Sequence, residues 1–384
     1  MEVYLDNSAT TKVYPAAADA ALRVMRETFA NPSSKHRAGF LAERELKEAA
    51  KIIAGSLHCS EKELIFTSGG TESDNMAIFG TAASRARKGR HFITTGIEHP
   101  AVLMPFAELE KQGCEVTYLP VSSEGLVSVE SVKNALRPDT VLVSVMMVNN
   151  ETGSRQPVEE IGTMLKKEAP DVYFHVDAVQ GFGKYRIKPA VCGIDMLSVS
   201  AHKIHGPKGI GLLYVRNGVR VSPLLYGGGQ QRDLRPGTEN VPGIAAMAAA
   251  VSDIYSDFDN KIRREYNLKK RLTEGLLSME GVTVNGQSLP AGAPHIVSAS
   301  FEGIKSEVLL HALEERGIYV SSGSACASNH PGLSGTLKAM GLTDAAINGT
   351  IRFSLCADNN EEEIDYTLNA LGELLPALRR FVRK

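Results

Sequence analysis

Short runs rich in Val, Ile and Leu recur along the first two thirds of the chain. The runs predict seven strands, at about residues 63–69, 90–96, 115–121, 140–148, 172–178, 195–201 and 209–215. Stretches with apolar residues at helical spacing predict amphipathic helices at residues 16–29, 38–57 and 102–113. Continuous apolar strands that alternate with helices are typical of a mostly parallel sheet covered on both faces. We therefore expect an α/β fold built on a mostly parallel, seven-stranded sheet flanked by helices.

The pattern changes after about residue 256. A charged amphipathic stretch at residues 259–279 is followed by strand-like segments at 282–286, 295–303 and 349–356, with helices between them. This mixture predicts a second, smaller α+β domain. We expect a large domain at residues 14–255 and a small domain made of residues 1–13 plus 256–384.

Composition narrows the class of protein. The 384 residues carry a formal net charge of −2 and no long basic stretch, which argues against direct binding to nucleic acid or to an anionic membrane. Apolar runs stay short of membrane-spanning length and the first residues lack a signal-peptide pattern, so we expect a cytoplasmic protein. The five cysteines lie far apart, a spacing that favours neither a disulfide framework nor a zinc site.

Two segments at predicted strand ends carry candidate ligand-binding groups. TSGGTESDN, residues 67–75, puts two glycines before a helix predicted to open at Thr71, with Asp74 as a capping partner, and the free N–H groups of a helix start bind anions. VYFHVDAVQG ends an apolar strand at Asp177, with Gln180 three residues on, at the sheet edge where ligands bind. A buried carboxylate there can pair with the ring nitrogen of a pyridine cofactor. Taken alone, the first segment is equally typical of an ordinary strand-turn-helix corner, and Asp177 is more typical of a residue that caps a turn.

Two further segments carry candidate nucleophiles. SVSAHKIHGPKG contains Lys203, a candidate Schiff-base lysine whose pKa would be lowered by Lys208 or by a protonated His202; a surface lysine is the alternative. YVSSGSACASNH surrounds Cys326 with Ser, Gly and Ala, which favours an exposed thiol in a loop. The remaining cysteines lie beside helix ends or apolar strands and are expected to be structural: Cys59, Cys114, Cys192 and Cys356.

Eight strings, in order, resemble the cysteine desulfurases of the nitrogen-fixation and iron–sulfur-cluster type. They are LDNSATT, TSGGTESDN, EHPAV, NNETG, HVDAVQ, SAHKIHGPKG, RPGTENV and SSGSACAS. The resemblance covers nearly the whole chain. It implies a fold-type I enzyme that depends on pyridoxal 5'-phosphate (PLP) and is related to the class-V aminotransferases. The SSGSAC form is similar to the branch with a long, mobile cysteine loop, here about residues 321–335.

The resemblance implies a role for each matched residue. Lys203 would form a Schiff base with PLP, Asp177 would pair with the ring nitrogen, and Gln180 would bond the phenolic oxygen. His99 would stack on the ring and take part in proton transfer. The phosphate would be held by Gly70, Thr71, Ser200 and His202.

The resemblance also implies a substrate site and a dimer. Arg352, with help from Asn149, which would also contact the cofactor, would bind the substrate carboxylate through paired hydrogen bonds. Family members are homodimers in which the residue matching Thr238 reaches the phosphate bound by the other protomer.

The implied reaction removes sulfur from L-cysteine. The substrate displaces Lys203, the Cα proton is lost, and the Cys326 thiolate attacks the substrate sulfur, which leaves a persulfide on Cys326 and releases L-alanine. An iron–sulfur scaffold or a tRNA- or cofactor-thiolating protein would then accept the sulfur. We expect no resident metal, only a transient iron–sulfur contact through Cys326. The alternatives are a selenocysteine lyase or other PLP lyase, a plain aminotransferase, and a non-catalytic sulfur-relay partner.

The sequence departs from the family pattern at two places. It ends at LLPALRRFVRK without the longer tail by which housekeeping members meet their cluster scaffold, so the sequence leaves open whether that contact is kept. Gln231 and Asp233 stand where Glu and Gly are more usual. Because Thr238 and its surroundings are kept, we expect little catalytic consequence.

Overall fold

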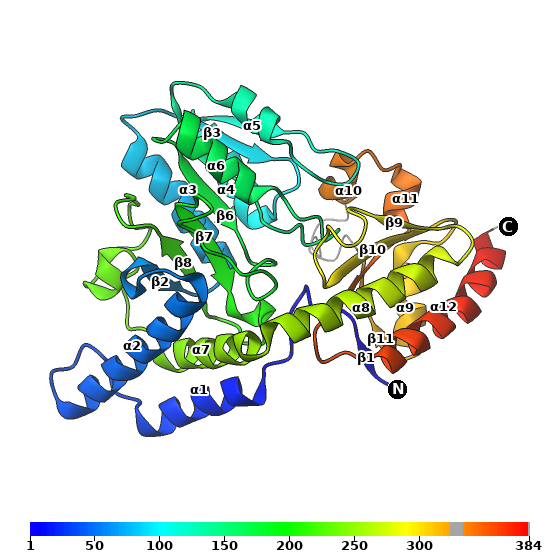
Figure 1. Ribbon diagram of the computed structural model, residues 1–384, viewed down its shortest axis with the longest axis horizontal. Helices are drawn as coiled ribbons and strands as arrows, with labels where there is room; N and C mark the ends of the chain where they lie inside the picture. The colour runs from blue at the N-terminus through cyan, green and yellow to red at the C-terminus, as the bar shows by residue number, and fades with distance from the viewer. Residues whose placement is uncertain (323–332, 383–384) are drawn as a thin grey trace.

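The computed structural model describes residues 1–322 and 333–382, and is built on a seven-stranded sheet (Figure 1). Cys326 lies outside the described residues. The strand order is β2-β8-β7-β6-β5-β3-β4, and β8 runs antiparallel to both of its neighbours while the other pairs are parallel. The strands are β2 (Leu64–Thr67), β3 (His91–Thr95), β4 (Glu115–Leu119), β5 (Thr140–Ser144), β6 (Tyr173–Asp177), β7 (Met196–Ser200) and β8 (Gly211–Val215). The prediction of a mostly parallel seven-stranded sheet is confirmed.

Strand β5 is shorter than its apolar run predicts. The run continues to Val148, but the ladder ends at Ser144, and Met146, Val148 and Asn150 then line a cavity. Apolar residues alone do not reveal where a buried strand gives way to a buried loop, because both are excluded from water.

Both faces of this sheet are buried, which explains its continuous apolar strands. In β8, Leu212 and Tyr214 pack into one core cluster, while Leu213 and Val215 pack into the cluster on the opposite face. This division follows from the two-residue side-chain period of a strand. The helices of this part of the chain are α1 (Pro15–Glu27), α2 (Arg37–Leu57), α3 (Gly70–Arg85), α4 (Pro100–Lys111), α5 (Val129–Ala135), α6 (Val158–Glu168) and α7 (Val241–Ser256).

A four-stranded antiparallel sheet with the order β12-β13-β10-β9 forms the second part of the molecule. Its strands are β9 (Val282–Asn285), β10 (Ile296–Phe301), β12 (Ser321–Ser322) and β13 (Thr350–Ser354). The accompanying helices are α8 (Phe258–Leu277), α9 (Ser306–Glu314), α10 (Gly335–Ala339), α11 (Asp344–Asn348) and α12 (Glu361–Val382). Its core forms a separate hydrophobic cluster. The predicted boundary near residue 255 falls close to the junction of α7 and α8, and stays a prediction.

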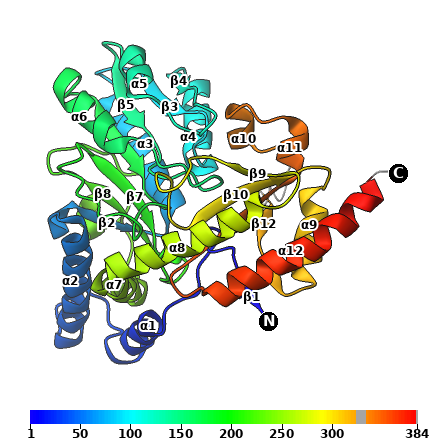
Figure 2. The ribbon, with the colours of Figure 1, turned by 45° about the vertical axis from the view of Figure 1, so that its right-hand side comes forward.

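The N-terminal segment joins this second part. Strand β1 (Val3–Tyr4) pairs in parallel with β11 (Ile318–Tyr319), and the Asp6 backbone forms a bridge with Ser354 of β13. From there the chain crosses toward the large sheet, where Thr11 N donates to His202 O at 2.9 Å. Figure 2 shows β1 beside the small sheet and α1 beneath the large one. Residues 5–11 therefore connect the two parts of the molecule.

No helix in the described ranges 1–322 and 333–382 is both long enough and apolar enough to cross a membrane.

Candidate active site

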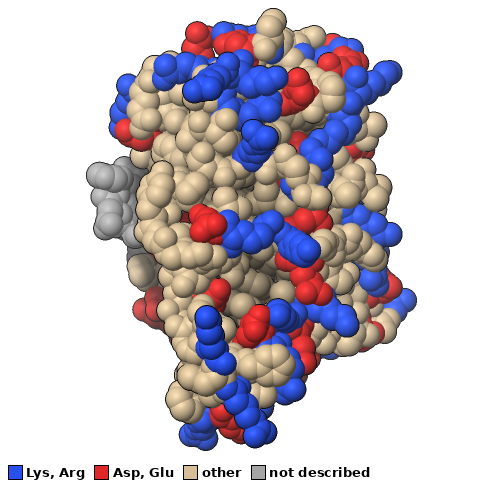
Figure 3. Space-filling model, turned by 90° about the vertical axis from the view of Figure 1, so that its left-hand side faces the viewer, with Lys and Arg blue, Asp and Glu red and all other residues tan. Residues whose placement is uncertain are grey.

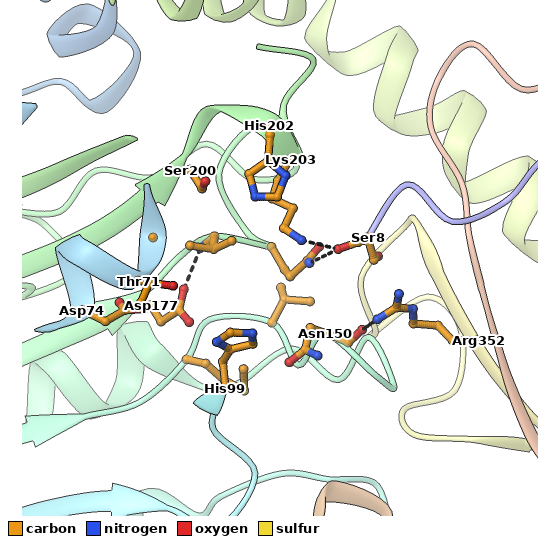
Figure 4. Close-up of a pocket in the computed structure, with 15 residues that line it drawn as sticks. Ser8, Thr71, Asp74, His99, Asn150, Asp177, Ser200, His202, Lys203 and Arg352 are labelled. Carbon is orange, nitrogen blue, oxygen red and sulfur yellow. Dashed lines mark hydrogen bonds between the residues drawn. The ribbon is translucent and has the colours of Figure 1, made fainter. Parts of the chain in front are cut away.

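A cavity of about 260 Å³ lies at the carboxyl ends of β3, β5, β6 and β7. This is the edge of an open α/β sheet at which ligands bind. Lys203 and His99 enter the cavity from opposite sides, and Asp177 and Arg352 lie at its two ends (Figure 4). The lining consists of Ser8, Gly70, Thr71, Asp74, His99, Met146, Val148, Asn150, Asp177, Val179, Gln180, Ser200, His202, Lys203 and Arg352.

Lys203 ends a short 3-10 helix, Ala201–Lys203, that follows β7 directly. Its ammonium group donates to the Ser8 carbonyl at 2.6 Å and to the Ala9 carbonyl at 2.8 Å. Two carbonyls of the N-terminal segment therefore fix the position of the amine, which points into the cavity (Figure 4). This is the placement that a Schiff-base lysine requires.

Asp177 is the last residue of β6 and is nearly inaccessible to water. Burial raises its pKa to about 6, against the opposing effects of the Val179 N–H, which donates to Oδ1 at 2.9 Å, and of Lys203. The sequence-based expectation of an acidic group facing the cavity from the end of this strand agrees with that position.

Asp74 stands beside Asp177, which contradicts the expectation that it caps α3. It lies inside α3, is fully buried, and has its Oδ1 3.6 Å from His175 Nε2. Burial and then Asp177 raise the pKa of Asp74 well above its ordinary value, against the effect of the Ser198 hydroxyl. Two adjacent buried carboxyls cannot both ionise at low cost, so the pair shares a proton. Asp74 holds it, because Asp177 has the nearby N–H and the cation.

His99 caps the start of α4, where its Nδ1 accepts the Ala101 N–H at 3.1 Å. Pro100 follows at the first helical position, where its fixed φ and missing N–H suit a helix start. Burial, and secondarily Lys203, lower the His99 pKa to about 4. The ring is therefore neutral at pH 7, with its proton on Nε2.

Gly70, Thr71, Ser200 and His202 gather where the cavity meets a second, more open hollow of about 570 Å³. This hollow is also lined by Lys208, by the start of α3 and its free N–H groups, and by Glu72, whose carboxylate is paired with Arg235. The expectation of a protonated His202 is wrong: burial, then Lys203 and Lys208, lower its pKa to about 4. His202 thus acts as a neutral hydrogen-bonding group, and its Nδ1 lies 3.2 Å from Thr10 Oγ1.

Arg352 comes from β13 of the small sheet and is almost completely buried. Its guanidinium donates to Asp6 Oδ1 at 2.8 Å and to the Asn150 carbonyl at 2.9 Å. The Nε group is buried without a hydrogen-bond partner in the described part of the chain. Arg352 thus retains an unused donor at the cavity wall.

Asn149 does not line the cavity, contrary to expectation. Its side-chain nitrogen donates to the Ile97 carbonyl, and its oxygen accepts the backbone N–H groups of Glu151 and Thr152. These bonds shape the turn after β5, so the amide is directed into the backbone. The next residue, Asn150, lines the cavity in its place.

Thr238 lies away from the cavity within one chain. It lines a separate small hollow with Ser68 and Gly209, both of which also line the open hollow next to the cavity. Gln231, one of the two departures from the family pattern, accepts the Phe66 N–H at 3.0 Å through its side chain in the same region.

Three polar residues of the site were not singled out in the sequence: Asp6, Ser8 and Asn150. Asp6 and Ser8 belong to the LDNSATT string, but their roles depend on contacts with residues nearly 200 or more positions away. Among the described residues, Cys59, Cys114, Cys192 and Cys356 are free thiols. In those same ranges no group of three or more His, Cys, Asp or Glu side chains is arranged to hold a metal ion.

Comparison with known proteins places the chain in a family. The aminotransferase class-V family matches residues 3–367. A cysteine desulfurase IscS of Methanosarcina thermophila is 45% identical over 377 residues, which cover 98% of this chain and 93% of that relative. A cysteine desulfurase of Nostoc sp. is 43% identical over 378 residues, 98% of this chain and 94% of that protein.

Among solved structures, a NifS-like protein superposes with a TM-score of 0.93 at 39% identity, covering 98% of this chain and all of that one. These findings confirm the resemblance drawn from the eight strings. The chain belongs to the aminotransferase class-V family and, within it, to the cysteine desulfurases, enzymes that use PLP.

Proposed function

We propose that this chain takes sulfur from L-cysteine onto Cys326 and releases L-alanine, with the cavity at the carboxyl ends of the large sheet holding both PLP and substrate. The observation that carries the proposal is the convergence of an amine, a buried carboxylate and a buried guanidinium on that cavity: Lys203, Asp177 and Arg352. The Lys203 amine can form a Schiff base, the Asp177 carboxylate can hold a pyridinium proton, and the Arg352 guanidinium can bind a carboxylate.

The residues at the cavity fit PLP. Lys203 offers an amine for the aldehyde, Asp177 a carboxylate for the ring nitrogen, and Ser200, Thr71 and His202 hydroxyl and imidazole groups for the phosphate. Ser8 Oγ and Arg352 Nε are buried without a partner in the described residues, and buried polar groups are rarely left so. When bound, PLP supplies an electron sink for the electrons left at Cα.

The chain's own groups control protons around that sink. Asp177, ionised beside a protonated Asp74, keeps the proton of the ring nitrogen in place. The neutral His99 presents a flat face and an Nε2–H without adding a positive charge that would oppose the Lys203 amine. Lys203 stands where it can accept and return the proton of the substrate Cα.

Arg352 selects a substrate with a carboxylate. Its fork is held by Asp6 and the Asn150 carbonyl, so binding does not have to immobilise the side chain. A solved structure of SspA in complex with cysteine superposes with a TM-score of 0.79 at 36% identity, covering 92% of this chain and 99% of that one. This relationship supports L-cysteine as the substrate.

The position of β12 supports Cys326 as the sulfur acceptor. Ser321 pairs with Arg352, and Ser322 pairs with Ile351. Cys326 follows Ser322 by four residues, a reach of at most about 14 Å even in an extended chain. The chain therefore enters the predicted cysteine loop beside the group proposed to bind the substrate.

Exposed apolar side chains support a homodimer. They occur on α1 and just after it, on α2 and in a loop after β8: Leu22, Met25, Phe29, Phe40, Ile52, Leu225 and Tyr226. Figure 3 views the side of α1 and α2, where wide areas without charged side chains separate mixed positive and negative ones. Large apolar side chains exposed on neighbouring elements are typical of an interface. In the proposed dimer Thr238 reaches the phosphate held by the other chain.

A sulfur acceptor and a cytoplasmic location complete the proposal. The free thiols among the described residues suit a reducing compartment. The acceptor would be an iron–sulfur scaffold or a thiolating enzyme, to which the Cys326 persulfide passes its sulfur.

The test is to incubate purified, PLP-loaded protein with L-cysteine and a thiol reductant and to measure alanine and sulfide. Equal amounts of both are expected. Cys326→Ala should abolish sulfide release and keep the visible absorbance of bound PLP, whereas Cys114→Ala, at a half-exposed free cysteine, should leave both intact. Desulfuration retained without Cys326 would contradict its role, and faster turnover of selenocysteine than of cysteine would favour the lyase alternative.

A further inference from the structure

The hydrogen bonds around Gln180 fix the orientation of its side-chain amide. Its Nε2 lies 3.0 Å from the Ser8 carbonyl oxygen, and its Oε1 lies 3.2 Å from His295 Nε2. A carbonyl oxygen only accepts, so the Gln180 atom that faces Ser8 must be the amide nitrogen. The amide oxygen therefore faces His295.

His295 precedes β10 and is fully buried. Because Gln180 Oε1 only accepts, His295 Nε2 must carry a proton, while Nδ1 is buried without a partner among the described residues. Burial lowers the His295 pKa well below its ordinary value, and the nearby cations act in the same direction: Lys184, Lys269, Arg352 and Lys203. The ring is therefore neutral, with its single proton on Nε2.

From these contacts we infer that His295 is a positioning residue that locks the Gln180 amide through an Nε2–H···Oε1 bond and so turns the second N–H of Gln180 toward the cavity. Gln180 lines that cavity, and its first N–H is bonded to Ser8. The same Ser8 carbonyl accepts from Lys203. A chain of hydrogen bonds thus runs from His295 through Gln180 and Ser8 to the predicted Schiff-base lysine.

The inference rests on the proposed function and on the role that the family resemblance implies for Gln180, a bond to the phenolic oxygen of PLP. A donor there stabilises negative charge on that oxygen and weakens its hold on the proton of the neighbouring Schiff-base nitrogen. The nitrogen then loses its proton at a lower pH. If the amide turned over, two oxygens would face each other, and the Schiff-base pKa would rise.

The ring tautomer can be measured in the native PLP-loaded protein. Labelling with ¹⁵N-histidine should give a ring signal with a protonated Nε2 and an unprotonated Nδ1 that stays unchanged from pH 6 to pH 8. Unlike the signal of His99, which has the same tautomer, this signal should be missing from His295→Gln. A His295 signal with the proton on Nδ1, or with protons on both nitrogens, would overturn the inference even if every variant failed to fold.

Two substitutions with side chains of similar length distinguish the effect of the His295 N–H from the effect of the volume that its ring occupies. His295→Met removes the N–H and should raise the pKa of the Schiff-base chromophore by about one pH unit, an ordinary size for one hydrogen bond to a charged group. His295→Gln keeps an N–H at comparable reach and should restore most of the shift. An equal shift in both variants, or in neither, would overturn the role of the donor.

Two controls exclude a general effect on the fold. His91 is a buried imidazole at the start of β3, bonded to Thr140 and Thr117 at the end of the strand away from the cavity. His91→Met should lower stability and leave the chromophore pKa in place. In a Gln180→Met background, His295→Met should add no further shift, and an additional full shift would show that His295 does not act through Gln180.

Failure of the inference and failure of the proposed function look different. A native protein that binds no PLP would contradict the proposed function, while the tautomer measurement would still test the His295 contact. A native chromophore with an unchanged titration in His295→Met contradicts only the inference.

Discussion

The cavity has two walls that differ in how they hold ionisable groups. We call the side formed by Asp177 and His99 the large-sheet wall, and the side formed by Arg352 of β13 the opposite wall. On the large-sheet wall, burial is the largest cause that moves the pKa of Asp177 up to about 6 and that of His99 down to about 4. On the opposite wall, the Arg352 guanidinium forms a direct ion pair with Asp6 at 2.8 Å. The large-sheet wall therefore sets which groups are protonated, and the opposite wall fixes the orientation of the Arg352 guanidinium. Substitutions in the first should change pH dependence and rate, and substitutions in the second should change KM.

Lys203 belongs to both walls, so its replacement should have the largest effect. It extends from the large sheet, but its amine is held by carbonyls of the N-terminal segment. Lys203→Gln should lower the rate of alanine formation by roughly 10³-fold or more, since a covalent step loses its nucleophile. Lys167→Gln, on the exposed side of α6, is the matched control and should retain the native rate. Near-native turnover by Lys203→Gln would contradict the role of Lys203 as the residue shared by the two walls.

Arg352→Gln should affect mainly KM. Loss of one member of a buried, hydrogen-bonded charge pair costs about 2 kcal/mol or more, which corresponds to at least roughly a 30-fold rise in KM for L-cysteine. Arg271 forms ion pairs with Asp365 and Glu361 on the surface, where such pairs contribute about 1 kcal/mol or less. Arg271→Gln should therefore keep the native KM. A fall in kcat at constant KM for Arg352→Gln would mean that this wall also takes part in the chemistry.

The carboxyl pair offers a sharper test of the large-sheet wall, because two adjacent residues should respond differently to the same change. If Asp74 holds the proton and Asp177 the charge, Asp177→Asn should lower the rate about 100-fold, while Asp74→Asn, which replaces a neutral group by a neutral amide, should lower it less than about tenfold. Alanine formation at pH 7 and at pH 8 measures both. The reverse order of effects would move the proton to Asp177.

The sequence predicted the large sheet because its strands, apart from the partly exposed edge strand β4, are buried on both faces and therefore read as apolar runs. Asp177 and Lys203 were candidates because they follow predicted strands, whose carboxyl ends a parallel topology brings to one edge, but their roles came from the family resemblance. The position of a residue in a motif did not predict correctly which of two neighbours faces the cavity, because this depends on side-chain direction. Asn149 and Asn150 are adjacent and identical, and only the turn after β5 decides which one faces the cavity.

Long-range partners were also beyond sequence reasoning. Asp74 resembles a cap when only α3 is considered, and its burial beside Asp177 depends on packing against β6 and β7. His295 and Asp6 act on Gln180 and Arg352, which lie 115 and 346 positions away along the chain. No local pattern encodes such pairs, because each residue alone is also consistent with an ordinary core or surface position.

The smallest expected effect concerns the junction between the walls, where His205 stacks on Tyr14 with ring centroids 4.0 Å apart. Burial, and then Lys184, lower the His205 pKa to about 4. As the pH falls below about 6.5, the imidazole is therefore protonated in the unfolded chain while it stays neutral in the folded chain. Stability is therefore complete above about pH 6.5 and declines as the pH falls toward 4. For His205 alone the loss between pH 8 and pH 5 should be about 2 kcal/mol.

His205→Asn tests this contribution, because Asn tolerates the φ of +60° found at this position. Urea unfolding of both proteins at pH 8 and pH 5 cancels the contributions of all other groups. The variant should be less stable at pH 8, since it loses the stacked ring, but should lose about 2 kcal/mol less than the native protein on acidification. Parallel losses in the two proteins would mean that the His205 ring accepts a proton in the folded state, and that burial at this junction does not exclude charge as it does on the large-sheet wall.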